Sequence, residues 1–208
     1  MSHPPPEPQD QHYFTARPAT ADERRDLTVE LAGRRVTVTT ARGVFSGDRV
    51  DPGTSVLLPE ITADDGEGHV LDLGCGWGPV ALTLAMLRPH QVVHAVDVNE
   101  RALDLVRGNA SRLGVAVRAS LPDDVDDVAF TEIWSNPPIR IGKDALHELL
   151  LRWLPRLAPG GVAHLVVQKN LGADSLHRWL ESGVLPGTST TRTTSSKGFR
   201  VLAVRREG

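Results

Sequence analysis

The sequence predicts an α/β fold in which a mostly parallel sheet is covered by helices on both faces. Three observations predict it: short apolar runs alternate with helical stretches from residue 69 onward, a glycine-rich turn follows the first of these runs, and two extended runs close the chain. With 208 residues, of which 40% are hydrophobic, the chain can bury a full core, and its length indicates one domain or at most two.

The start of the chain is predicted to be an extension of this domain. Residues 1–11 are rich in proline and polar side chains, a composition typical of a disordered tail. We expect residues 12–60 to form a β-hairpin extension with a lid, and residues 61–208 to form the main domain.

The strands and helices follow in order from the apolar pattern. Strands are predicted over residues 69–73, 92–98, 115–119, 130–134 and 162–168, and helices over residues 80–87, 101–113, 145–157 and 174–180. Alternating apolar and polar residues predict two antiparallel hairpins, one over residues 26–40 with its turn at Ala32 and Gly33, and one over residues 188–205. We expect the second hairpin at the edge of the sheet.

Charge and composition exclude several classes of protein. No apolar run is long enough to cross a bilayer, and the N-terminus lacks the basic and apolar regions of a secretory signal, so we expect a cytoplasmic monomer without a membrane partner. The single cysteine, Cys75, excludes a disulfide framework and a cysteine-rich metal site, and we expect no metal. The net charge of −3 does not indicate a nucleic-acid binder, so an RNA substrate would need a local basic patch.

The turn Asn136-Pro137-Pro138-Ile139 closes the apolar run 130–134. Each proline lacks an N–H, has a fixed φ and pushes the residue before it towards extended geometry, so the strand must stop here and stay stiff. The side-chain carbonyl of Asn136 and the backbone carbonyl of Pro137 remain as acceptors, and together they can hold the two N–H groups of a planar amine. The turn therefore favours chemistry on nitrogen.

A second motif, Gly-Cys-Gly-Trp-Gly at residues 74–78, follows a predicted strand and opens a helix at Pro79. Glycines let a backbone approach a ligand closely, and a helix N-terminus offers free N–H groups. The dinucleotide fingerprint places its third glycine three residues after the second, whereas Gly78 follows Gly76 by two, so the spacing is wrong for NAD. A nucleoside ligand is still indicated, because Asp97 ends the next strand, where a carboxylate can accept both ribose hydroxyls.

Taken together, the run from Asp72 to Gly78, the acidic Asp97 and the Asn136-Pro137-Pro138 turn resemble a class I S-adenosylmethionine-dependent methyltransferase that acts on nitrogen. This resemblance implies the Rossmann-like sheet of that class and S-adenosyl-L-methionine as the cofactor.

The resemblance extends over about residues 45–205, and it also points to one family within this class. Residues 44–46, 51–54, 119–120, 135–138 and 197–202 are similar to the small-domain methyltransferases. That family includes ribosomal RNA guanine methyltransferases, which modify the exocyclic amine.

The resemblance also implies a set of cofactor-binding residues. They are Asp72, Gly74, Cys75, Gly76, Gly78, Asp97, Val98, Asn99, Ser120 and Asn136. Asp72 would orient the glycine loop and the amino-acid end of the cofactor, and Asp97 would bind the ribose. Asn99 and Ser120 would flank the adenine or ribose, although Asn99 equally fits a helix N-cap and Ser120 a turn residue.

The residues expected to be catalytic are Asn136, Pro137, Pro138 and Ile139. The lone pair of an aromatic amine is delocalised into its ring, and two fixed acceptors would localise and aim it, so positioning and electrostatics do most of the catalysis. No strong base is required, and we nominate no histidine. Many N-methyltransferases of this type carry an aromatic residue at the position of Ile139, where it stacks on the target base. Isoleucine offers the base only an apolar contact, so stacking gives less support to a base as the substrate.

The residues expected to bind substrate are Phe45, Arg140, Lys143, Lys197 and Arg200. Phe45 would act as a lid, and the four cations would contact phosphate or form a basic rim. The leading substrate is the exocyclic amine of guanine in ribosomal RNA, with recognition within a ribosomal subunit as one option. A protein glutamine amide, another RNA base, and a cofactor-binding module without turnover remain alternatives.

Overall fold

A computed structural model of the protein describes residues 23–208. The predicted disordered tail, residues 1–11, and the start of the extension lie outside the described residues. The strands are β1 (Arg24–Leu31), β2 (Arg34–Ala41), β3 (Gly68–Leu73), β4 (Gln91–Val96), β5 (Arg118–Ser120), β6 (Phe130–Ser135), β7 (Leu157–Gln168), β8 (Thr188–Ser196) and β9 (Phe199–Arg206).

Five α-helices and four 3₁₀ helices complete the described residues. The α-helices are α1 (Pro52–Leu57), α2 (Pro79–Leu87), α3 (Glu100–Leu113), α4 (Lys143–Trp153) and α5 (Ala173–Glu181). The 3₁₀ helices are η2 (Leu58–Glu60), η3 (Ile139–Ile141), η4 (Leu154–Arg156) and η5 (Lys169–Leu171). Within residues 23–208, no helix combines the length and the apolar character needed to cross a membrane.

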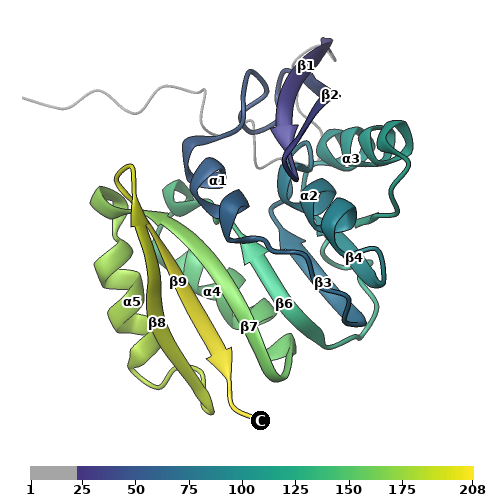
Figure 1. The fold of residues 1–208 in the computed structure, drawn as a ribbon. Coiled ribbons are helices and arrows are strands. Elements are labelled where there is room, and N and C mark those ends of the chain that lie inside the picture. Colours follow the sequence, from purple (N-terminus) through teal and green to yellow (C-terminus); the bar gives the residue numbers. More distant parts are fainter. Residues whose placement is uncertain (1–22) are drawn as a thin grey trace, which may run out of the picture.

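Seven strands form one central sheet in the order β5-β4-β3-β6-β7-β9-β8 (Figure 1). The pairs from β5 to β7 are parallel, whereas β9 runs antiparallel to both β7 and β8. The predicted α/β fold, with a mostly parallel sheet and a C-terminal antiparallel hairpin, is therefore confirmed. The predicted N-terminal hairpin is confirmed as the separate two-stranded sheet of β1 and β2.

Several predicted boundaries were wrong, each for a local reason. The strand expected over 115–119 begins only at Arg118, because Gly114 ends α3 in the left-handed conformation. The helix expected over 145–157 ends at Trp153, and η4, which contains Pro155, follows it. Strand β4 ends at Val96, so Asp97 stands just beyond the strand.

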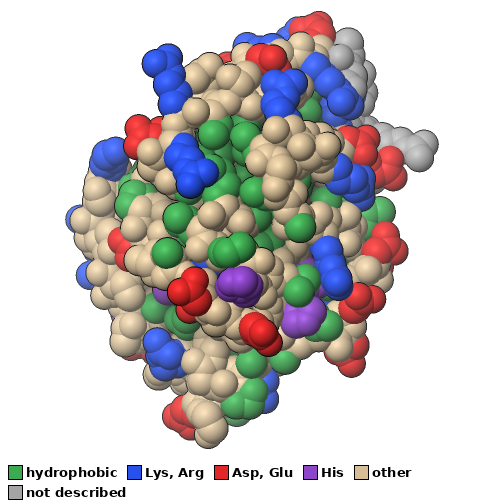
Figure 2. All heavy atoms as spheres, turned by 45° about the vertical axis from the view of Figure 1, so that its right-hand side comes forward, with side chains coloured by type: hydrophobic (Ala, Val, Ile, Leu, Met, Phe, Trp, Pro, Cys, Tyr) green, Lys and Arg blue, Asp and Glu red, His purple; other side chains and the backbone are tan. Residues whose placement is uncertain are grey.

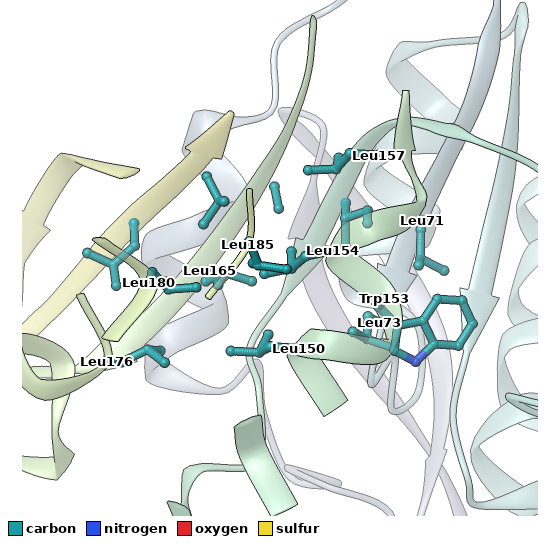
Figure 3. Close-up of a cluster of buried hydrophobic side chains, with 14 of the residues drawn as sticks. Leu71, Leu73, Leu150, Trp153, Leu154, Leu157, Leu165, Leu176, Leu180 and Leu185 are labelled. Carbon is teal, nitrogen blue, oxygen red and sulfur yellow. The ribbon is translucent and has the colours of Figure 1, made fainter. Parts of the chain in front are cut away.

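Helices cover both faces of the sheet, as predicted. Side chains on one face of the strands, such as Val70, Trp134 and Val166, pack with α1, α2 and α3. Side chains on the opposite face, such as Leu71 and Leu165, pack with α4, which contributes Trp153, and with α5 (Figure 3). Alternate residues of a strand point to opposite faces, so each strand is apolar on both sides, as expected for a buried parallel sheet.

The β1–β2 hairpin packs against α3. Leu31 and Val38 are buried together with Trp77 of the glycine loop and with residues of α3. Asn109 of α3, itself 1% exposed, accepts a hydrogen bond from Thr39 N at 2.7 Å and donates to Thr39 O at 2.9 Å and to Trp77 O at 3.2 Å. The hairpin is therefore joined to the same helix that supports the glycine loop.

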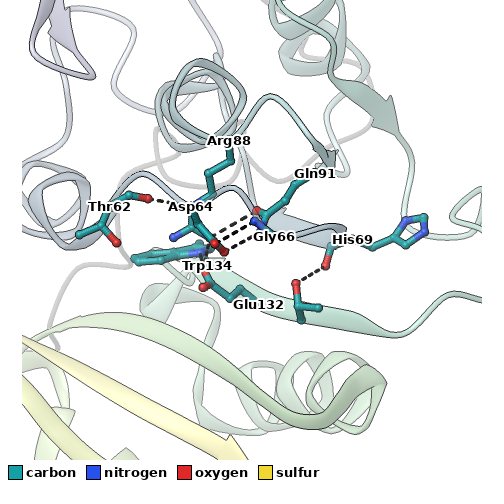
Figure 4. Close-up of polar contacts among 9 residues, drawn as sticks. Thr62, Asp64, Gly66, His69, Arg88, Gln91, Glu132 and Trp134 are labelled. Atoms are coloured by element: carbon teal, nitrogen blue, oxygen red, sulfur yellow. Dashed lines mark hydrogen bonds and ion pairs between the residues drawn. The ribbon is translucent and has the colours of Figure 1, made fainter.

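A polar network links the end of α2 to β6 and to the segment before β3 (Figure 4). Arg88 is 3% exposed; it donates to Glu132 Oε2 at 2.7 Å and to Thr62 O at 2.9 Å. Trp134 Nε1 donates to the same carboxylate oxygen at 2.7 Å. These bonds satisfy a buried ion pair and fasten the segment before β3.

Two histidines meet on neighbouring strands near this network. His94 of β4 is 3% exposed, its Nε2 lies 2.9 Å from Nδ1 of His69 on β3, and its ring meets Phe130 edge to face. Burial lowers the pKa of His94 from 6.5 to about 4, and the electrostatic effect of the neighbouring His69 also lowers it. The folded protein therefore holds His94 neutral.

We predict that the free energy of unfolding falls as the pH falls from 6.5 to about 4, partly because of His94. The unfolded chain binds this proton below about pH 6.5, whereas the folded one resists it until about pH 4, which amounts to roughly 3 kcal/mol at the acid end. In the His94→Gln variant, the free energy of unfolding should fall less steeply over this pH range, as measured by urea unfolding. Equal slopes for both proteins would contradict the prediction.

Candidate active site

The carboxyl ends of three neighbouring parallel strands bring the predicted motifs together. Because β3 lies between β4 and β6, the glycine loop that follows β3 stands between Asp97 after β4 and Asn136 after β6 (Figure 1). A pocket at this edge is lined by Asp72, Gly74, Cys75, Gly76, Asn136 and Phe45. Six residues that the sequence predicted to act thus share one pocket.

The glycine loop has a backbone that other residues rarely adopt. Gly74, Gly76 and Gly78 have φ values of 76°, 54° and 96°. The N–H groups of Gly74 and Cys75 both donate to Val96 O, at 2.8 and 3.1 Å, so the loop is attached to the end of β4. A side-chain carbon built on Gly74 would meet no atom within 4 Å, and Gly74 is exposed, so open space lies above the loop.

Two carboxylates, Asp72 and Asp97, accept backbone hydrogen bonds next to and within this loop. Asp72 is 3% exposed, and its Oδ2 accepts a hydrogen bond from Ala81 N at the start of α2 at 2.9 Å. Burial raises the pKa of Asp72 to about 7, and the charge of Asp97 also raises it. A cation bound beside Asp72 would offset this cost of burying its charge.

Asp97 connects the loop to the helix that follows β4. One of its carboxylate oxygens accepts from Gly76 N at 2.9 Å, and the other accepts from Asn99 N at 2.9 Å. Burial raises the pKa of Asp97. Each oxygen retains a further lone pair, so Asp97 can still accept hydrogen bonds from hydroxyl groups.

The other predicted cofactor residues lie around this pocket in different settings. Asn99 is 1% exposed; its Oδ1 accepts from Arg101 N as the N-cap of α3, and its Nδ2 donates to Gly43 O at 2.8 Å. Val98 is 41% exposed. Ser120 lines a second hollow, between α3 and the end of β5. The capping interpretation of Asn99 is confirmed, and its side chain is engaged by the backbone on both sides.

Asn136 is held in one orientation by two residues near α1. Its Nδ2 donates to Asp51 Oδ1 at 2.6 Å and to Thr54 Oγ1 at 3.1 Å. A carboxylate has no proton to donate, so the atom of Asn136 that faces Asp51 must be its amide nitrogen. With both N–H groups directed to α1, the Oδ1 of Asn136 has no hydrogen-bond donor among the groups that the structure describes, so it is available as an acceptor at the pocket.

The start of α1 is fitted closely around this amide. Asp51 is the N-cap of α1, and its Oδ1 accepts from Gly53 N at 2.7 Å and from Thr54 N at 3.2 Å. A side-chain carbon on Gly53 would lie 3.0 Å from Asp51 Oδ1, 3.1 Å from Phe199 Cε1 and 3.2 Å from Asn136 Nδ2. Only glycine leaves these three groups in place.

Sequence reasoning missed the roles of Asp51 and Thr54. The run Asp51-Pro52-Gly53-Thr54 carries the signal of a helix start, an N-cap aspartate followed by a proline. That signal predicts α1, but nothing local indicates that the same carboxylate also bonds an amide 85 residues away.

The remaining predicted residues lie at the rim of this edge or away from it. Pro137 is buried in the turn, while Ile139 begins η3, which also contains Arg140. The exposed Lys143 and Lys197 lie at the start of α4 and in the β8–β9 turn. Phe45 is 44% exposed at the pocket, and its carbonyl oxygen is the atom nearest to Gly76.

Arg200 does not reach the rim as a free cation. Its guanidinium forms an ion pair with Asp174 of α5, and its side chain is only 12% exposed. Its role in substrate binding stays a prediction that this placement does not favour.

Comparison with known proteins extends over most of the chain. The sequence model described as "Methyltransferase small domain" matches residues 35–203. A Bacillus subtilis protein named "Uncharacterized protein YbxB" is 34% identical over 176 residues, which cover 82% of this chain and 88% of that protein. The ribosomal RNA small subunit methyltransferase C of Pseudomonas aeruginosa is 32% identical over 186 residues, which cover 86% of this chain and 54% of that protein. The chain thus spans about half the length of the ribosomal RNA methyltransferases that it matches.

Solved structures share the fold. A 16S rRNA N2 methyltransferase from Thermus thermophilus, in complex with AdoMet and guanosine, superposes with a TM-score of 0.70 at 22% identity, covering 91% of this chain and 52% of that one. A methyltransferase from Pyrococcus furiosus gives a TM-score of 0.61 at 24% identity, covering 76% and 84%. The fold is that of the class I methyltransferases, and with the match over residues 35–203 the chain belongs to the methyltransferase small-domain family.

Proposed function

We propose that this protein transfers a methyl group from S-adenosylmethionine to an exocyclic amine, the N2 amine of guanine in small-subunit ribosomal RNA. The observation that carries the proposal is the fixed Asn136, whose free Oδ1 stands beside a glycine loop built to lie against a ligand. The relatives named as ribosomal RNA methyltransferases support the RNA part of the proposal.

The residues of the pocket fit this cofactor. When bound, S-adenosylmethionine supplies an electrophilic methyl group on a sulfonium sulfur. Gly74 leaves open space where a ligand can lie against the backbone. Asp72, whose buried charge lacks a cationic partner among the described residues, suits the ammonium of the cofactor's amino-acid end, and Asp97 suits the two ribose hydroxyls.

Asn136 and Pro137 prepare the amine for attack. Their carbonyl oxygens accept one N–H each, which localises the nitrogen lone pair and aims it in line with the methyl group. S-adenosylmethionine held by Asp72 and Asp97 would supply the methyl group with its sulfur as the leaving group, and the methylated amine would lose its proton to water. Acceptors that are already fixed need no reorganisation during the reaction, which is why the bonds from Asn136 to Asp51 and Thr54 matter for the rate.

Unpaired cations surround the same edge of the sheet. Lys143, Lys169 and Lys197 are the only lysines of the chain; all three are exposed and none has an ion-pair partner within residues 23–208. Lys169 follows β7 and Lys197 follows β8, at the edge of the sheet where Asn136 follows β6, and Lys143 begins α4. On the face shown in Figure 2, Lys and Arg side chains surround hydrophobic ones in the upper half. Such cations suit contacts to RNA phosphates.

The proposal is tested by incubating the protein with labelled S-adenosylmethionine and either total RNA, small ribosomal subunits or protein extract, followed by nucleoside analysis. We expect label in N2-methylguanosine from the RNA or the subunits. Label in protein alone, or tight cofactor binding without any transfer, would overturn the proposal in favour of a glutamine methyltransferase or a binding module.

Asn136→Ala should lower methyl transfer about 100-fold or more, because removing one preorganised partner of the reacting group costs at least that much in comparable sites. Cofactor affinity should change little, because Asp72, Asp97 and the glycine loop remain. Steady-state kinetics and isothermal titration with S-adenosylhomocysteine separate the two effects. Asn170→Ala removes an exposed amide in η5 and serves as the control; equal activity of both variants would rule out the role of Asn136.

Gly53→Ala should also lower methyl transfer, by about 10-fold or more, because its new carbon crowds Asp51, Phe199 and Asn136 at 3.0 to 3.2 Å. Gly108→Ala is the matched control: Gly108 lies exposed in α3 with no atom within 4 Å of an added carbon, so this variant should keep its activity and gain slightly in stability. An active Gly53→Ala protein would show that the geometry around Asn136 is not critical.

A further inference from the structure

The two carboxylate oxygens of Asp51 are used very differently. Oδ1 accepts three hydrogen bonds, from Gly53 N, Thr54 N and Asn136 Nδ2. Oδ2 has no partner within the described part of the chain, residues 23–208. Asp51 is half-buried and lines the same pocket as Asn136. Asp51 therefore offers the pocket a carboxylate oxygen without a partner among the described residues, on a side chain that bonds the amide nitrogen of Asn136.

The neighbour of the amine distinguishes the candidate substrates. In guanine, the N2 amine lies between two ring nitrogens: N3, which has a lone pair and accepts, and N1, which carries a hydrogen and donates. In adenine and cytosine, the ring nitrogen next to the amine has a lone pair and accepts, and in a glutamine amide the neighbour is a carbonyl oxygen, which also accepts. Guanine alone among these presents two adjacent donor groups on one edge.

We propose that Asp51 selects guanine, with its Oδ2 accepting the N1–H of the base while Asn136 and Pro137 hold the N2 amine. The inference rests on the function proposed above and adds the substrate-selecting residue to it. Neighbouring donors on the base require neighbouring acceptors on the protein, and the 2.6 Å bond between Asp51 and Asn136 holds their side chains side by side. Against adenine, cytosine or glutamine, the same oxygen meets a lone pair and repels it.

Asp72 is the second carboxylate that lines this pocket, and its surroundings differ from those of Asp51. It lies below the glycine loop, is 3% exposed and bonds the start of α2. Among the described residues its hydrogen bond goes to Ala81 N, whereas Asp51 bonds Asn136 directly. Asp51, in the N-terminal segment, is therefore the carboxylate suited to select the base, whereas Asp72 is suited to bind the cofactor.

Asp51→Asn tests this assignment with little change of shape. An asparagine still caps α1 well, and its oxygen must take the place of Oδ1 because three donors converge there. The amide nitrogen then replaces Oδ2, so an acceptor becomes a donor. The probes are guanosine and 2-aminopurine riboside, titrated into the protein with S-adenosylhomocysteine. They share the N2 amine, but only guanosine carries a hydrogen at N1 and an oxygen at C6.

The wild-type protein should bind guanosine at least about 10-fold more tightly than 2-aminopurine riboside, the difference expected for a hydrogen bond to a charged group. Asp51→Asn should bring this ratio to about one or reverse it. Thr54→Val is the matched control: it also loosens Asn136 but offers the base nothing different, so both affinities should fall together and the ratio should stay. Thermal unfolding verifies that each variant is folded.

Equal affinities in the wild type, no binding of either nucleoside, or an unchanged ratio in Asp51→Asn would overturn the inference. The labelling experiment separates this failure from that of the proposed function. If guanine in RNA is methylated while the ratio does not depend on Asp51, only the selecting role is lost. If label enters protein alone, the proposed function fails and this inference with it.

Discussion

The hydrogen bond from Asn136 to Asp51 is the interaction on which the candidate site depends. It joins residues that are 85 positions apart, so it exists only when β6 is in the sheet and α1 is docked against β7 and β9. Two donors of one amide are occupied by Asp51 and Thr54, which leaves a single orientation for the oxygen. A flexible side chain is thereby converted into a fixed acceptor, and the entropy of ordering it is lost on folding rather than in the reaction.

The N-terminal segment belongs to the site rather than standing apart from it. Its hairpin is joined to α3 and to the glycine loop through Asn109, and Gly43 accepts from Asn99 beside Asp97. The same segment continues through Phe45 at the pocket to Asp51. The N-terminal segment, the glycine loop and the turn after β6 thus line one pocket together.

Features that are written locally in the sequence were predictable. The glycine loop, the Asn136-Pro137 turn and both hairpins each have a pattern within a few residues, and the structure confirms them. Contacts between distant residues were not predictable. Nothing near Asp51 indicates Asn136, and nothing near Arg200 indicates its ion pair with Asp174, because each pairing depends on how the sheet places separate segments. The boundary errors at Gly114 and Pro155 arose where a cap or a proline outweighed apolar periodicity.

In the proposed complex, Asn136 presents its Oδ1 and Asp51 its Oδ2 to one edge of a guanine base. A crystal structure of the protein with S-adenosylhomocysteine and guanosine would reveal this arrangement. We expect the N2 amine to lie about 2.7 to 3.2 Å from Asn136 Oδ1 and Pro137 O, with N1 equally close to Asp51. A base bound with its amine away from Asn136, or with a ring acceptor facing Asp51, would contradict the proposal.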